Sequence, residues 1–202
     1  MDKQISNLSD EDKFLLRETW ASMNRNIQKI AVNIFGMIFE ECPDAKSLFP
    51  FTDISKKNSD FIKFHSLRFM QAIESVLLAV NDIDTIGPLL TNLGHVHGKL
   101  EERVNFKTEY WNVFRDCTLF HFKRALTKNH AITKIQQTLS KRIQSKIDMN
   151  YVIMLWQILL DFMIAEMTRS FNEEVQARKM RMGKRHLKDE RDEMLKKKRA
   201  EM

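Results

Sequence analysis

The segment from Phe61 to Val104 constrains the fold more than any other part of this chain. It reads FIKFHSLRFMQAIESVLLAV, a short turn, and then LLTNLGHVHGKLEERV. Apolar residues recur in both halves at steps of three and four, which predicts two helices that each bury one face. Each predicted inward face contains one histidine. The inward positions are Phe61, Phe64, His65, Phe69, Ala72, Ile73, Val76 and Val80 in the first helix and Leu89, Leu93, His97 and Leu100 in the second.

Two facing histidines allow two interpretations. A histidine on an apolar helix face is usually a structural residue that hydrogen-bonds to a backbone group. If the two predicted helices are adjacent and antiparallel, however, His65 and His97 face each other across a gap that a flat metal cofactor fits. The rest of the sequence must discriminate between a structural pair and a ligand pair.

The composition favours an all-α protein. Glycine (5) and proline (3) are scarce among 202 residues, whereas methionine (12) and phenylalanine (14) are abundant, which disfavours a turn-rich β architecture. The length suits one well-buried domain with an appendage. Cys42 and Cys117 offer no disulfide framework and no secretion signal is apparent, so we expect a cytoplasmic protein.

The richest apolar run, YVIMLWQILLDFMIA, is interrupted by Gln157 and Asp161. It is also shorter than the roughly 20 residues that a bilayer span needs. This run therefore predicts a core helix. Near the N-terminus, Ser9 followed by acidic residues predicts a helix cap, and that helix is expected to end near Met23 with Trp20 in the core.

The net charge of +6 is concentrated at the C-terminal end. Residues 178–202 contain eleven Lys/Arg and five Asp/Glu, and residues 1–177 contain 22 of each, so a neutral domain precedes a basic tail. We expect the tail to extend the last helix. Such a run is usually solvated, and an acidic protein or a membrane surface is the alternative partner. Because no aromatic residues are interleaved with the basic ones, no specific nucleic-acid recognition is predicted.

Taken in order along the chain, these features resemble the globin family. The resemblance covers residues 8 to about 172, and the spacing of 32 residues from His65 to His97 is the one expected for neuroglobin-like and nematode-type globins. It implies an all-α globin fold with bound haem b, iron protoporphyrin IX. The residues that carry it are Leu8-Ser9, Trp20, the pattern IFxxIFxxxPxxxxLF from Ile34 to Phe49, His65, the segment Leu93-Gly94-His95-Val96-His97, and Trp156 followed by Leu159, Leu160 and Met163.

The resemblance assigns different roles to the two histidines. It implies that His97 is the proximal ligand of the haem iron, with its other ring nitrogen held most simply by the carbonyl of Leu93. His65 resembles the distal histidine, which either donates a hydrogen bond to the bound gas or binds the iron itself. His95 lies roughly 200° around the helix from His97 and is expected to face solvent.

Further residues match positions around the porphyrin. Phe35 and Phe69 resemble distal-pocket residues, and Phe49 resembles the aromatic residue that stacks on the porphyrin. Arg68 either pairs with a propionate or is an ordinary solvated arginine. The predicted cofactor-binding residues are Phe35, Phe49, His65, Arg68, Phe69, Leu93, His97 and the apolar corner residue Val104, with His97 and His65 as metal ligands.

Two segments depart from the family pattern. Residues 131–148 carry a thin apolar stripe that begins at Ile132, which predicts an additional amphipathic helix before the last core helix. We expect it to cover the domain; a homodimer contact and an acidic partner are the alternatives. The short connection from Phe49 to His65 suggests that the small helix found there in many globins is missing.

The resemblance implies reversible binding of dioxygen or another diatomic gas, used for sensing, storage or redox signalling. A haem-based electron-transfer enzyme or one that converts nitric oxide or nitrite is the first alternative. A haemless helical interaction module, in which both histidines are structural, is the second. No catalytic triad, phosphate-binding loop or suitably spaced carboxylate pair supports another kind of catalysis.

Overall fold

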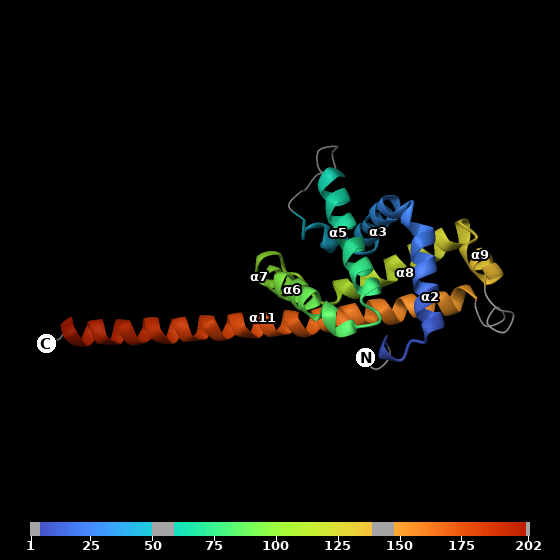
Figure 1. The fold of residues 1–202 in the computed structure, drawn as a ribbon. Helices are drawn as coiled ribbons and strands as arrows, with labels where there is room; N and C mark the ends of the chain where they lie inside the picture. Colours follow the sequence, from blue (N-terminus) through green and yellow to red (C-terminus); the bar gives the residue numbers. More distant parts are fainter. Residues whose placement is uncertain (1–4, 50–58, 139–147, 201–202) are drawn as a thin grey trace.

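The computed structural model describes residues 5–49, 59–138 and 148–200, and its elements there are all helical. Figure 1 shows the other helices gathered around the first half of α11, whose second half extends away from them. The prediction of an all-α fold is therefore confirmed. The helices are α2 (Asp10–Asn24), α3 (Ile27–Glu41), α4 (Pro43–Lys46), α5 (Ser59–Leu78), the 3-10 helix η1 (Ile83–Ile86), α6 (Gly87–Gly98), α7 (Leu100–Val104), α8 (Tyr110–Lys128), α9 (Ala131–Thr138) and α11 (Met149–Ala200).

Local sequence signals set several helix ends. Ser9 caps α2 as predicted: its hydroxyl accepts a hydrogen bond from the Asp12 N–H at 3.2 Å, and the Asp12 carboxylate accepts one from the Ser9 N–H at 3.0 Å. Pro43 follows the end of α3 and opens α4, because proline fits the first turn of a helix but not its interior. Asn105 ends α7 in the left-handed conformation.

An aromatic cluster ties α2, α8 and α11 together in the core. The rings of Trp20, Phe122 and Trp156 lie with centroids 5.0–6.2 Å apart. The indole N–H of Trp156 donates to the Thr19 hydroxyl at 3.1 Å, and that of Trp20 donates to Glu74 of α5 at 3.0 Å. Both buried indoles are thus satisfied, and the prediction of Trp20 as a core residue is confirmed.

The long helix α11 joins the predicted core helix and the predicted tail extension in one element. Its first part contributes Val152, Leu155, Trp156 and Leu159 to the core. Within the part of the chain that the structure describes, α11 is the one helix long and apolar enough to cross a membrane, and 44% of its apolar window is buried against the body. The position of these residues agrees with the core helix expected from the sequence.

One predicted residue position is wrong, and two predicted segments lie partly or wholly outside the described residues. Phe64 was expected to face inward, but its side chain is 55% exposed and lies under the Arg68 guanidinium, 4.4 Å from ring centroid to Cζ. Of the predicted additional helix, α9 is observed with Ile135 buried, and residues 139–147 lie outside the described residues. The predicted loss of a small helix concerns residues 50–58, which are also outside them.

Two glycines let α6 lie directly against α11. A Cβ atom added to Gly94 would stand 2.4 Å from the Met167 carbonyl oxygen and 2.7 Å from the Ser170 Cβ. One added to Gly98 would stand 2.9 Å from the Glu174 Cβ. Since real Cβ atoms do not come so close to backbone, the two glycines set the separation of the two helices. This contact fixes the position of the helix that carries both His95 and His97.

Replacing Gly94 by alanine should destabilise the protein. The added methyl group must displace the α11 backbone, and overpacking of this kind costs about 1–3 kcal/mol. The measurement is the free energy of unfolding in urea.

Gly36→Ala is the matched control, because Gly36 is an exposed helix residue whose added Cβ meets nothing within 4 Å. That change should stabilise the protein by about 0.5–1 kcal/mol, since alanine favours the helix. Equal effects of the two substitutions would contradict the steric role of Gly94.

Candidate functional site

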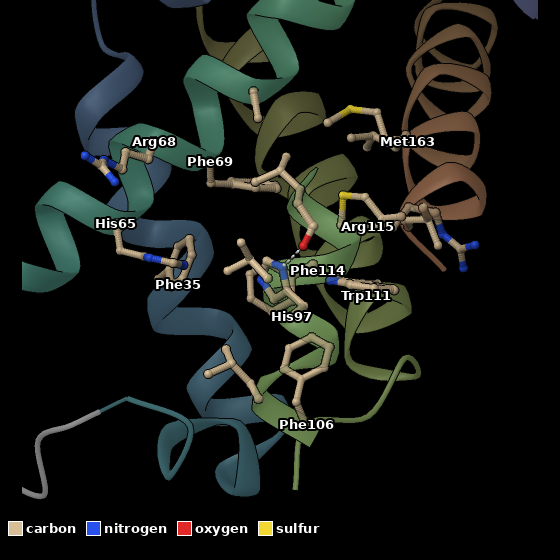
Figure 2. A pocket seen from close by; sticks show the side chains of 17 residues that line it. Phe35, His65, Arg68, Phe69, His97, Phe106, Trp111, Phe114, Arg115 and Met163 are labelled. Carbon is tan, nitrogen blue, oxygen red and sulfur yellow. Dashed lines mark hydrogen bonds between the residues drawn. The ribbon is translucent and has the colours of Figure 1, made fainter. Parts of the chain in front are cut away.

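A cavity of about 300 Å³ lies between the helices that carry the two histidines and the core helices α8 and α11 (Figure 2). Its walls are mainly apolar, and among the described residues its charged or titratable lining groups are two histidines and two arginines. The lining residues are Phe35, His65, Arg68, Phe69, Ala72, Leu93, Val96, His97, Leu100, Phe106, Trp111, Phe114, Arg115, Leu160, Met163, Ile164 and Met167.

The hydrogen bond to Leu93 determines which nitrogen of His97 is available. Nδ1 of His97 donates to the Leu93 carbonyl oxygen, one helical turn earlier, at 2.7 Å. Because a carbonyl only accepts, Nδ1 carries the proton and Nε2 keeps its lone pair. The rings of Phe106 and Trp111, with centroids 5.0 and 5.7 Å away, pack against the imidazole. His97 therefore has a defined tautomer and orientation, and its bond partner is the one expected.

Both cavity histidines are neutral near pH 7. Burial lowers the pKa of His97, against the smaller opposing effect of the Leu93 hydrogen bond. Burial also lowers the pKa of His65 to about 4, with further lowering from the charges of His97 and Arg68. The effect of His97 on the pKa of His65 indicates that the two imidazoles lie close enough to interact. The neutral form is the one that binds a metal ion or donates a single N–H hydrogen bond.

Aromatic rings hold His65 in place. Its imidazole lies edge-on to Phe35 and Phe49, with centroids 5.5 and 5.2 Å away. Phe35 is fully buried and also contacts Phe69 and Phe114, at 6.0 and 5.3 Å. Among the lining residues from α3 and α5, the side chains that carry N–H groups are His65, held by these rings, and Arg68 at the cavity edge.

The two arginines at the cavity have different surroundings. Arg68 is exposed at its edge, over the Phe64 ring. Arg115 is engaged: its guanidinium donates to Asp161 of α11 at 2.9 Å and to Asp116 at 2.8 Å. Arg115 thus links α8 to α11, whereas Arg68 is available to a ligand.

Most of the predicted site residues are brought together. Phe35, His65, Arg68, Phe69, Leu93 and His97 all line the cavity. Phe49 contacts His65 and Phe35 but is not among the lining residues that the structure describes, and neither is Val104. His95 lies on another side of α6, with its side chain 38% exposed and its Nε2 atom 3.7 Å from Glu173.

The cavity wall formed by α8 and α11 was not predicted from the sequence. The segment that forms α8 has more apolar residues than one buried stripe requires, and this surplus could have indicated that it contacts neighbours on more than one side. The lining residues missed in this way are Trp111, Phe114, Arg115, Leu160, Met163, Ile164 and Met167, together with Ala72, Val96, Leu100 and Phe106.

The imidazoles of His65 and His97 fit a metal ion whose other ligands belong to a bound cofactor. Within the described residues, no group of three or more His, Cys, Asp or Glu side chains is placed to hold a metal ion. Two neutral imidazoles in one apolar cavity could supply at most two metal ligands. They therefore suit a flat metal complex whose remaining four ligands belong to the cofactor.

The lowered pKa of His65 predicts acid sensitivity of the cofactor-free protein. Between pH 6.5 and about 4, the His65 imidazole is protonated in the unfolded chain but not in the folded chain. The free energy of unfolding is therefore highest above pH 6.5 and decreases as the pH falls toward 4. His65→Gln should remove about 3 kcal/mol of this pH dependence. The measurement is urea unfolding of both proteins at pH 7 and pH 4; equal pH dependence in both would contradict the burial of a neutral His65.

Comparison with known proteins identifies the family. The globin family model matches residues 32–147, more than half of the chain. Haemoglobin subunit alpha-D of Sturnus vulgaris is 28% identical over 102 residues, covering 50% of this chain and 70% of that protein. Neuroglobin of Chaenocephalus aceratus is 28% identical over 98 residues, covering 46% of this chain and 62% of that protein.

Solved structures share the fold at low sequence identity. A hexacoordinated heme protein from an anhydrobiotic tardigrade aligns with a TM-score of 0.63 and 17% identity, over 82% of this chain and 96% of that one. Neuroglobin of the marine acoel Symsagittifera roscoffensis aligns with a TM-score of 0.55 and 17% identity, over 79% and 98%. Family membership implies haem as the group that the two imidazoles face, and the chain belongs to the globin family.

Proposed function

We propose that this globin binds haem b between His97 and His65 and reversibly binds dioxygen or another diatomic gas, for sensing, storage or redox signalling in the cytoplasm. The observation that carries the proposal is the hydrogen bond from His97 Nδ1 to Leu93, which leaves Nε2 unprotonated and available to a metal. The haem would supply the iron to which the gas binds. The protein supplies the axial nitrogen, the apolar walls and one hydrogen-bond donor.

The side chains around the cavity have separate tasks in this proposal. His97 holds the iron, and the Leu93 carbonyl keeps its ring turned toward the haem. Phe35 and Phe69 keep water out of the distal side, because neither offers a polar group. Arg68 is exposed at the edge of the cavity and would pair with a haem propionate.

We further propose that His65 occupies the sixth iron position when no gas is present. Two observations support this: His65 is neutral because burial, with a smaller effect of His97, lowers its pKa to about 4, and the rings of Phe35 and Phe49 hold it in place. A protein with the same fold is described as a hexacoordinated heme protein. Such a resting state also suits the electron-transfer alternative, since two nitrogen ligands keep the iron surroundings similar in both oxidation states.

Haem binding should depend on His97 and not on His95. Loss of His97 removes the proximal nitrogen, so His97→Ala should lose at least tenfold in haem affinity, measured by titration of the Soret absorbance. His95→Ala is the matched control, because it removes an imidazole two residues away that faces Glu173. No Soret band in the wild-type protein expressed with sufficient haem would exclude the proposal, and equal losses in the two variants would exclude His97 as the proximal residue.

The ferrous spectrum tests the role of His65. We expect sharp low-spin bands in the wild-type protein without added ligand, and a broad high-spin spectrum in His65→Leu, which cannot supply the sixth nitrogen. Carbon monoxide should then associate faster with the variant, because no side chain must first leave the iron. A high-spin spectrum of the wild-type protein would contradict coordination of the iron by His65. It would not contradict the proposal that the protein binds haem.

A further inference from the structure

The second half of α11 forms an exposed helical arm. From Lys179 to Lys197 every side chain is exposed, whereas Phe171, two turns earlier, is buried. Figure 1 shows this arm extending away from the other helices. Its nineteen residues correspond to a rod of about 28 Å.

Arg178 anchors the base of the arm to the body. Its guanidinium donates to the Gly98 carbonyl oxygen at 3.1 Å and also pairs with Glu101 and, at 3.5 Å, with Glu102. The side chain is only 16% exposed. The arm therefore begins directly after Arg178, the first residue of the predicted tail, which is docked next to the C-terminal end of α6.

Charge on the arm is segregated around the helix axis. At about 100° per residue, one half of the circumference, called here the cationic face, contains no carboxylate. The four carboxylates, Asp189, Glu190, Asp192 and Glu193, all lie on the opposite half. The cationic face comprises Arg181, Lys184, Lys188 and Arg191 with the apolar residues Met180, Leu187, Met194 and Leu195.

The side chains of the cationic face are largely uncommitted. Within the described part of the chain, Lys184, Lys188 and Arg191 make no ion pair, and Arg181 pairs only with Glu174 at its base. Met180, Leu187 and Met194 are 63–66% exposed. This face thus presents free cations around a narrow apolar line.

A second copy of the chain is a poor occupant of this face. Met180, Leu187 and Met194 repeat every seven residues, but the positions between them in a coiled-coil seam are Gly183, Glu190 and Lys197. The residues that flank the seam include Lys184 and Arg191. In either a parallel or an antiparallel pair, these would meet basic residues of the other copy, and like charges oppose association.

A groove in an acidic protein also fits less well. Helices that dock in grooves use apolar anchors at three- and four-residue steps, with aromatic or large aliphatic residues in deep pockets. The arm has five apolar residues over about five turns, of which Met180, Leu187 and Met194 follow one line at seven-residue steps, and it has no aromatic residue. A flat anionic surface needs only the cations and a shallow apolar contact.

We propose that the cationic face of the arm docks the protein on the surface of a bilayer that contains anionic lipids. The opposite face, with all four carboxylates, then points to water. Lysine and arginine stems lie along the interface with their charges at the lipid headgroups, and Leu187 and its apolar neighbours insert shallowly. The inference does not depend on haem or on the role of either cavity histidine.

The test uses the full-length protein and two variants that remove three positive charges each. One carries Lys184→Gln, Lys188→Gln and Arg191→Gln on the cationic face; the control carries Arg185→Gln, Lys196→Gln and Lys197→Gln on the opposite face. Binding is measured by co-sedimentation with vesicles of phosphatidylcholine containing about 30% phosphatidylserine, at roughly 0.15 M salt. Circular dichroism verifies that helix content is unchanged.

We expect the wild-type protein to bind these vesicles and not vesicles of pure phosphatidylcholine. The cationic-face variant should bind more than tenfold more weakly, since each surface cation contributes roughly fivefold, and the control should lose less than threefold. Equal losses would overturn the proposed orientation of the arm. No wild-type binding, or binding to polyglutamate instead of the vesicles, would overturn the membrane proposal.

Discussion

The close contact between α6 and α11 is the constraint on which the rest of the structure depends. Gly94 and Gly98 allow the two backbones to approach to a distance that any side chain would prevent. Through this contact the longest helix of the protein supports the short helix that carries His97. The Arg178 guanidinium adds a hydrogen bond to the Gly98 carbonyl oxygen, directly after the histidine. The position of one imidazole is thus set by packing and reinforced at the end of its helix.

The cavity combines two requirements that usually oppose each other. Its walls are mainly apolar, which excludes water, yet it contains two imidazoles. Burial without a counter-charge resolves the conflict, because it keeps both rings neutral at physiological pH. A carboxylate beside either ring would have favoured the protonated form, which cannot bind a metal.

Much of the site was predictable because its chemistry is local. The three- and four-residue steps around His65 and His97 follow from helix geometry, and the bond from His97 to Leu93 lies within a single turn. Phe64 was misplaced because it follows the same period at the start of the helix, where the body does not cover it. The cavity wall from α8 and α11 was missed, since periodicity shows that a helix is buried but not which neighbour it faces.

The sequence by itself determined the all-α class, the capped and proline-bounded helix ends, the core tryptophans, the two inward histidines and the continuation of the last helix into a basic tail. Each of these depends on residues within a few turns of one another. Only the tertiary structure decided that both histidines share one cavity, that Gly94 is needed for the approach of α11, and that Arg178 docks while the residues after it do not. These features depend on contacts between distant segments, which hydrophobic period and charge do not specify.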